Sequence, residues 1–276
     1  MSASSQLDNL HVVLVNTRNP LNVGAAARAM SNFGFFHLRV VNPYELAFRE
    51  ARSAVGASPL LARAEEFKTV AEAVADCTLV VGTTAVGRRD PQHPVKRLEQ
   101  AAPLIRKRLA GTRIALLFGS EKRGLSNEDL SHCHWLLRIP TREDHRSMNL
   151  GQAVAVCLYE LARNSSASFH HPNSRRVIPS QPAASRRSEG SAFRSHPASA
   201  ADLERITASL LDALRASGYL KSLPTGAPKR RSAAPPDEKI RRLVHRLQLS
   251  ASDAELLLGI LRQILWKSRS ANDPAD

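Results

Sequence analysis

The sequence predicts an α/β protein with a parallel sheet, followed by a small α-helical C-terminal module. Three observations support this fold class. Short apolar runs rich in β-branched residues alternate with helical patterns over residues 1–164, which is typical of a parallel sheet. Over residues 165–200 serine, proline and arginine dominate and apolar periodicity disappears, which predicts a disordered basic linker. Amphipathic helical spacing then returns over residues 201–276.

Five apolar runs of strand length define the sheet that we expect in residues 1–164. They are residues 11–15, 37–41, 78–82, 113–118 and 136–139. The run at residues 113–118 is the most apolar, so we expect it in the centre of the sheet, where both faces are covered. Helices are expected to begin near Asn22, Thr69, Pro103, Ser126 and Ser147. Proline is tolerated in a first helical turn, which is where we place Pro103.

The balance of charge bears on the class of partner. The chain has 39 Lys and Arg against 25 Asp and Glu, a formal net charge of +14. Such a surplus favours polyanions, because bound cationic side chains release the counterions that are condensed on phosphates. Nucleic acid is therefore the partner that we expect, with a solvated basic surface as the alternative.

The cysteines and the N-terminus indicate the compartment. Cys77, Cys133 and Cys157 form no CxxC pair and no Cys/His pair at ligand spacing, so each is expected to be a packed free thiol. The N-terminus has no signal-peptide pattern, and no apolar run reaches the roughly 20 residues that span a bilayer. The sequence therefore predicts a cytoplasmic protein with no membrane segment.

Three loops follow predicted strands and are crowded with small or polar residues. They are residues 83–85, 119–124 and 140–149. Because the carboxyl ends of parallel strands share one edge of a sheet, we expect these loops to meet there. Their exposed amides suit a flat heterocycle, although each loop alone is also ordinary turn chemistry. The nucleotide signatures GxGxxG and GxxxxGK[ST] and the hydrolase signature GxSxG are absent.

Three motifs, two of them at these loops and one near the first predicted helix, resemble those of the SpoU/TrmH branch of the SPOUT RNA 2'-O-methyltransferases. NVGAAAR at residues 22–28 is similar to the first motif and GSEKRGL at residues 119–125 to the second. IPTREDHRSMNLGQA at residues 139–153 is similar to the third, with Met148 and Leu150 where that family usually has Leu and Val. Both replacements keep apolar character. The loop at residues 83–85 and the helical tail most resemble the TrmJ-type tRNA enzymes.

This resemblance implies details of the fold and an activity that the residue patterns alone do not predict. It implies a SPOUT domain whose C-terminal part forms a trefoil knot, a homodimer, and S-adenosyl-L-methionine as the cofactor. The implied reaction is 2'-O-methylation of tRNA ribose, at the pyrimidine of position 32 in the anticodon loop, without a metal. Two alternatives stay open: methylation of ribosomal RNA, and a non-catalytic RNA-binding protein of the same fold.

The resemblance also implies the residues of the site. The implied cofactor contacts are Thr83, Thr84, Ala85, Gly119, Gly124, Leu125, Ile139, Arg146, Ser147 and Met148. The implied catalytic set is Arg28, Asn22, Glu121, Ser147 and Asn149. Structural roles remain open for several of them. Gly119 and Gly124 are also suited to positive φ, Ser147 and Asn149 to capping a helix, and Glu121 to organising its loop.

Arg28 is the residue that we expect to act on the reacting groups. A guanidinium has a pKa above about 12 and is a poor proton acceptor in solution. We therefore expect Arg28 to hold the phosphate beside the target ribose and to stabilise the developing alkoxide. Whether it also accepts the proton of the ribose hydroxyl is left open by the sequence.

The C-terminal third is expected to form three amphipathic helices. The first has an apolar stripe between residues 203 and 214, and the second has Ile240, Leu243, Val244 and Leu247 on one face and arginines on the other. Ser252 and Glu255 resemble a capping box for the last helix. A basic helical module suits RNA positioning, and support of a dimer is the alternative.

Overall fold

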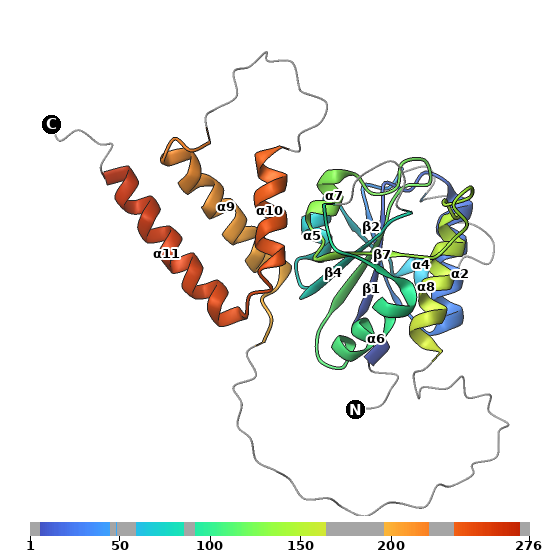
Figure 1. Ribbon diagram of the computed structural model, residues 1–276. Helices are drawn as coiled ribbons and strands as arrows, with labels where there is room; N and C mark the ends of the chain where they lie inside the picture. Colours follow the sequence, from blue (N-terminus) through green and yellow to red (C-terminus); the bar gives the residue numbers. More distant parts are fainter. Residues whose placement is uncertain are drawn as a thin grey trace, which may run out of the picture.

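The computed structural model describes residues 6–44, 48, 59–85, 92–163, 196–220 and 235–270. Within this part of the chain, a seven-stranded sheet carries helices on both faces, and three further helices stand beside it (Figure 1). We predicted a disordered linker over residues 165–200. Residues 165–195 lie outside the described residues, whereas Ala198 is buried and Ala200 already begins a helix. None of the described helices is long and apolar enough to cross a membrane.

Every strand pairing in the described sheet is parallel, as the alternation of strands and helices predicted. In spatial order the strands are β3 (Glu65–Phe67), β2 (His37–Val41), β1 (Leu10–Val15), β6 (Ile114–Phe118), β4 (Leu79–Thr83), β7 (Trp135–Arg138) and β5 (Val95–Arg97). The central position of β6, the most apolar strand, is confirmed. The carboxyl ends of β4, β6 and β7 therefore lie side by side at one edge.

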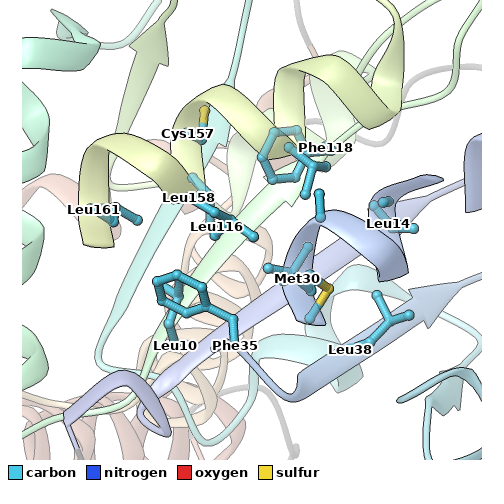
Figure 2. Packing of buried hydrophobic residues seen from close by; sticks show 14 of the residues in the cluster. Leu10, Leu14, Met30, Phe35, Leu38, Leu116, Phe118, Cys157, Leu158 and Leu161 are labelled. Carbon is cyan, nitrogen blue, oxygen red and sulfur yellow. The ribbon is translucent and has the colours of Figure 1, made fainter. Parts of the chain in front are cut away.

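Both faces of the sheet are buried, because successive residues of each strand enter opposite cores. In β1, Val12 and Leu14 belong to one core and Val13 and Val15 to the other. The first core is covered by α2 (Pro20–Phe33), α4 (Pro59–Ala62), α6 (Leu98–Leu109) and α8 (Leu150–Ala162). Figure 2 shows Met30 of α2 and Leu158 of α8 packed with Leu116 of the central strand. The second face is covered by α5 (Val70–Val74), α7 (Asn127–Ser131) and the start of α9.

Several short elements escaped the sequence prediction. Strands β3 and β5 have three residues each and α4 has four, too short for a periodicity to show. The placement of Pro103 in a first turn was wrong, because α6 begins at Leu98. Leu98, Ala101 and Ala102 are buried against the sheet, and this burial offsets the loss of one helical hydrogen bond at Pro103.

The helical module consists of α9 (Ala200–Ala216), α10 (Pro236–Arg246) and α11 (Ala251–Ser270). In Figure 1, α9 lies between the other two helices, and all three stand on the side of the sheet that carries α5 and α7. The module has a small apolar core of its own, formed by Ala198, Leu203, Ile206, Val244, Ala254, Leu258 and Leu261. It is joined to the sheet domain by backbone bonds. The amides of Ala200 and Ala201, in the first turn of α9, donate to the carbonyls of Cys77 and Ala75 over 2.8 and 3.0 Å.

The apolar stripe that we predicted for α10 was partly wrong. Leu243 and Leu247 are exposed, whereas Arg242, Val244 and His245 are buried. The helix is rotated so that its Arg241 donates to the Ser131 hydroxyl of the sheet domain and its His245 ring lies against His134. The carboxylate partner of Arg241 is Glu204 of α9. Periodicity identified the helix but not the face that packs.

The capping residues of α11 also differ from the prediction. Ser250, not Ser252, precedes the first helical turn, and its Oγ accepts a hydrogen bond from the Asp253 amide over 3.1 Å. The Ser250 hydroxyl also donates to the Asp253 carboxylate over 2.6 Å. Because the amide of Ala251 is bonded to the carbonyl of His196, the helix begins two residues earlier than expected.

Candidate functional site

One cavity of about 460 Å³ lies at the carboxyl ends of β4, β6 and β7. It is lined by the loops that follow these three strands. All ten residues for which the sequence implied a cofactor contact line it: Thr83, Thr84, Ala85, Gly119, Gly124, Leu125, Ile139, Arg146, Ser147 and Met148. The parallel sheet brings these loops together from positions as far apart as residues 83 and 148.

The first loop is fixed by bonds to both neighbouring strands. The Thr83 hydroxyl donates to the carbonyl of Leu117 in β6 over 2.8 Å. The Thr84 amide donates to the carbonyl of Leu137 in β7 over 2.9 Å. The loop is thus held in the cavity wall at the point where β4 leaves the sheet.

The second loop folds back on itself so tightly that its first residue has no room for a side chain. A Cβ on Gly119 would lie 2.0 Å from the carbonyl carbon of Gly124. Gly124 has a φ of 67°, and its amide donates to the carbonyl of Ser120 over 2.8 Å. Positive φ therefore explains Gly124 but not Gly119, where close approach of backbone is the cause. Leu125, which ends the loop, is buried in the second core.

A polar chain connects all three motifs. Asn149 Nδ2 donates to Asn22 Oδ1 over 2.8 Å, and Asn22 Nδ2 donates to Glu121 Oε1 over 3.0 Å. The same carboxylate accepts the amides of Arg18 and Asn19, each over 3.3 Å. Burial alone would raise the pKa of Glu121, but these hydrogen bonds lower it below its usual value. Glu121 therefore stays ionised and holds the start of α2 against the second loop.

The third loop enters α8 through Asn149. Asn149 Oδ1 accepts the amides of Gly151 and Gln152 over 2.9 and 3.3 Å, so this residue is the N-cap. The prediction that the helix begins at Ser147 was wrong by three residues, because the Asn149 cap starts it at Leu150. Ser147 is left in the wall of the cavity instead.

The predicted catalytic residues occupy three different positions. Glu121 and Ser147 line the cavity, whereas Asn22 and Asn149 are not among its lining residues and are joined to Glu121 by the polar chain. Arg28 is exposed on α2 and is not among the residues that line the cavity. In the described part of one chain, the residue expected to act on the reacting groups is therefore separated from the cavity.

Several residues of the cavity wall were missed by the sequence analysis, among them His93 and Arg242. His93 precedes β5, is 6% exposed, and its Nε2 has no hydrogen-bond partner among the described residues. Burial and the nearby Arg242 cation lower the pKa of His93 to about 4. Arg242 itself comes from α10 of the helical module. Periodicity could not find Arg242, because only the docking of the module decides that it faces the cavity.

Comparison with known proteins places this fold and cavity in a family. The SpoU rRNA Methylase family matches residues 9–159. A tRNA (cytidine/uridine/adenosine-2'-O-)-methyltransferase TrmJ of Pseudomonas aeruginosa is 40% identical over 156 residues, which are 56% of this chain and 61% of that protein. A tRNA (cytidine/uridine-2'-O-)-methyltransferase TrmJ of Sodalis glossinidius is 31% identical over 94% of this chain and 92% of its own length. The chain belongs to the SpoU rRNA Methylase family.

A solved structure extends the similarity to the helical module. The crystal structure of TrmJ from Z. mobilis ZM4 is 29% identical in sequence and superposes with a TM-score of 0.70. The superposition covers 92% of this chain and 98% of that one. The similarity thus reaches beyond residues 9–159, over which the family itself matches.

Proposed function

We propose that this protein transfers a methyl group from S-adenosylmethionine to the 2'-hydroxyl of ribose in tRNA. The observation that carries the proposal is the single cavity that collects all ten implied cofactor contacts from three separate loops. The relatives named above, two of them tRNA 2'-O-methyltransferases, support the same reaction and substrate.

The cavity fits the cofactor in size and in chemistry. Its volume of about 460 Å³ lies in the range of small-molecule sites. Leu125, Ile139 and Met148 provide apolar contact for a flat heterocycle, and the turns at Thr84 and Gly119 provide peptide groups for its polar edge. The trefoil knot that the family resemblance implies would bring these loops together in the same way.

The reaction requires alignment and the management of one proton. When bound, S-adenosylmethionine supplies a methyl group that is already activated as a sulfonium. The ribose 2'-oxygen forms the new bond to that carbon, the carbon–sulfur bond breaks, and the hydroxyl proton leaves. The three loops fix the donor, and alignment of this kind lowers a barrier by about 7 kcal/mol in favourable models. The Arg28 guanidinium would hold the neighbouring phosphate and stabilise the alkoxide.

We further propose that Arg28 reaches the cavity of a second copy of the chain in a homodimer. Arg28 is exposed and does not line the cavity of its own chain, so an arrangement in trans would complete the site. Arg28→Ala should then lose methyl transfer while its binding of S-adenosylmethionine persists. Arg63→Ala, which removes another exposed arginine, serves as the control and should keep full activity.

A mixture of two inactive variants tests the shared site. Gly119→Ala should distort the second loop and disable the cavity, because its Cβ would collide with backbone. In random dimers of Gly119→Ala and Arg28→Ala chains, half of the molecules contain one intact site out of two, so about a quarter of the wild-type activity should return. No recovery would contradict a site shared between chains. Inactivity of the unaltered protein on every RNA would contradict the methyl-transfer proposal itself.

The RNA substrate is tested by direct mapping. The unaltered protein should methylate tRNA in preference to ribosomal RNA, and we propose the pyrimidine at position 32 as the site. Mapping of 2'-O-methylation in RNA from a deletion strain identifies the nucleotide. Loss of a ribosomal mark instead would favour the rRNA alternative, and no change in any RNA would favour a non-catalytic RNA-binding protein.

The helical module is the proposed tRNA-positioning part, and residues 165–195 are the linker that we propose between it and the sheet domain. Lys239, Arg246, Arg262 and Lys267 are exposed on its helices. Their joint replacement by Gln should weaken tRNA binding and its salt dependence, with the affinity for S-adenosylmethionine unchanged. These substitutions are preferable to truncation, because removing the module also removes Arg242 from the cavity wall. Undiminished tRNA binding would contradict this role and favour the alternative that the module supports a dimer.

A further inference from the structure

A buried cluster at the junction of the helical module and the sheet domain contains two histidines and one glutamate. His132 follows the last residue of α7, Glu204 lies on α9 and His245 lies on α10. One ligand atom from each residue lies within 4.8 Å of the other two. The cluster therefore joins three helices that are far apart in the sequence.

The burial of these side chains leaves polar atoms without adequate partners. His132 is 5% exposed and His245 is fully buried. Neither ring nitrogen of His245 has a hydrogen-bond partner within the described residues. A buried polar atom without a partner is costly, so a native structure that keeps one requires an explanation.

We propose that His132, Glu204 and His245 bind a divalent first-row transition metal ion, with zinc as the ion that the ligands suit best. Two imidazoles and one carboxylate form a well-known zinc ligand set that leaves a fourth position for water. His132 Nδ1 lies 2.9 Å and His245 Nε2 lies 3.7 Å from Glu204 Oε1. Ligands of a tetrahedral zinc ion are about 3.4 Å apart, so small side-chain shifts accommodate the ion.

The neighbouring Arg241 contacts the carboxylate of the proposed metal site. Its Nε lies 3.1 Å from Glu204 Oε2, and its Nη1 donates to the Ser131 hydroxyl over 3.0 Å. The same Nε lies 3.0 Å from Glu204 Oε1, so Arg241 contacts both oxygens of the carboxylate and fixes its orientation beside the histidines, as partners outside a metal's ligands commonly do.

The site would fasten the module to the second cofactor loop. Helix α7 begins at Asn127, two residues after that loop ends at Leu125. An ion bound by the residue after α7 and by two module helices would therefore fix the module against the cavity wall. This inference does not depend on the methyl-transfer proposal, because the ion lies outside the cavity residues.

Metal binding to the full chain tests the inference. The protein is stripped with a chelator, incubated with one equivalent of zinc, passed through gel filtration and analysed for metal content. We expect one zinc per chain and a rise in Tm of about 5 °C. His245→Gln and Glu204→Gln should lose both effects, while His196→Gln, which removes an exposed imidazole, should keep them.

Cobalt keeps the test valid if the variants do not fold. Addition of Co²⁺ to the unaltered stripped chain should produce visible absorption bands of a four-coordinate ion, and zinc should displace them. Absence of these bands together with no retained zinc would overturn the inference. Zinc retained equally by folded His245→Gln protein would overturn it as well, because the ion would then be bound elsewhere.

Discussion

The sheet domain and the helical module bury different kinds of residue. In the sheet domain, apolar strands are covered on both faces, and the polar residues of the motifs gather at one edge. In the module, the apolar core is small, and Arg242 and His245 are buried at the junction while Leu243 stays exposed. A hydrophobic pattern therefore identifies the packed face where a sheet covers it, but not where two domains meet through polar groups.

The largest expected difference in folding stability is between truncating a leucine in the core of the sheet and truncating one on the exposed face of α10. Leu116 is fully buried in β6, the central strand (Figure 2). Leu116→Ala should lower the free energy of unfolding by about 3 kcal/mol, because it leaves a cavity between packed elements. Leu243→Ala on α10 should change it by less than about 0.5 kcal/mol, since Leu243 is 42% exposed. Urea unfolding of both variants measures the contrast, and equal losses would contradict it.

Removing the junction carboxylate should have the next largest effect. Glu204 pairs with Arg241 over 3.0 Å and faces two buried histidines. In metal-free buffer, Glu204→Gln should destabilise the protein by about 2–3 kcal/mol, because it leaves a largely buried cation without its partner. Asp212→Asn breaks an exposed pair with Arg215 and should cost about 0.5 kcal/mol or less. Thermal unfolding of the two variants compares them, and similar losses would mean that the junction charges are solvated.

A buried histidine should make the sheet domain sensitive to acid. His11 of β1 is 5% exposed. Burial and the nearby Arg39 cation lower its pKa from 6.5 to about 4. The unfolded chain therefore binds the proton first as the pH falls below 6.5, and stability declines by about 1.4 kcal/mol per pH unit until about pH 4.

The variant His11→Gln checks this origin of the acid sensitivity. Between pH 6.5 and 5 it should lose about 2 kcal/mol less stability than the unaltered protein. His145→Gln, which removes an exposed imidazole, is the control and should follow the unaltered profile. Identical pH profiles for all three proteins would show that His11 is not responsible.

The smallest effect distinguishes the two serines at the start of α11. Ser250→Ala removes the acceptor of the Asp253 amide and should cost about 1 kcal/mol. Ser252→Ala should cost less, because Ser252 lies within the first turn and accepts no capping amide among the described bonds. Thermal unfolding decides between them, and a larger loss for Ser252→Ala would restore the capping box that the sequence suggested.

Much of the site could be predicted because its loops follow strands with clear signals. Apolar runs identified β4, β6 and β7, two of the three motifs identified the loops after β6 and β7, and small polar residues identified the loop after β4. Apolar runs and motifs could not identify cavity residues that come from other parts of the sequence. His93 and Arg242 line the same cavity, but neither lies in a motif, and Arg242 was expected on a solvated face.

The sequence by itself determined the parallel sheet, its central strand and the three loops that form the cavity, and the family resemblance of its motifs implied the ten cofactor contacts. The sheet and the loops follow from apolar runs and loop chemistry, which are local properties of the chain. Only the tertiary structure decided that Asn22, Glu121 and Asn149 form one polar chain, that α10 turns arginine and histidine inward, and that His132 meets Glu204 and His245. The physical reason is that a buried polar group is stable only beside its partner, and the partner comes from a different part of the fold.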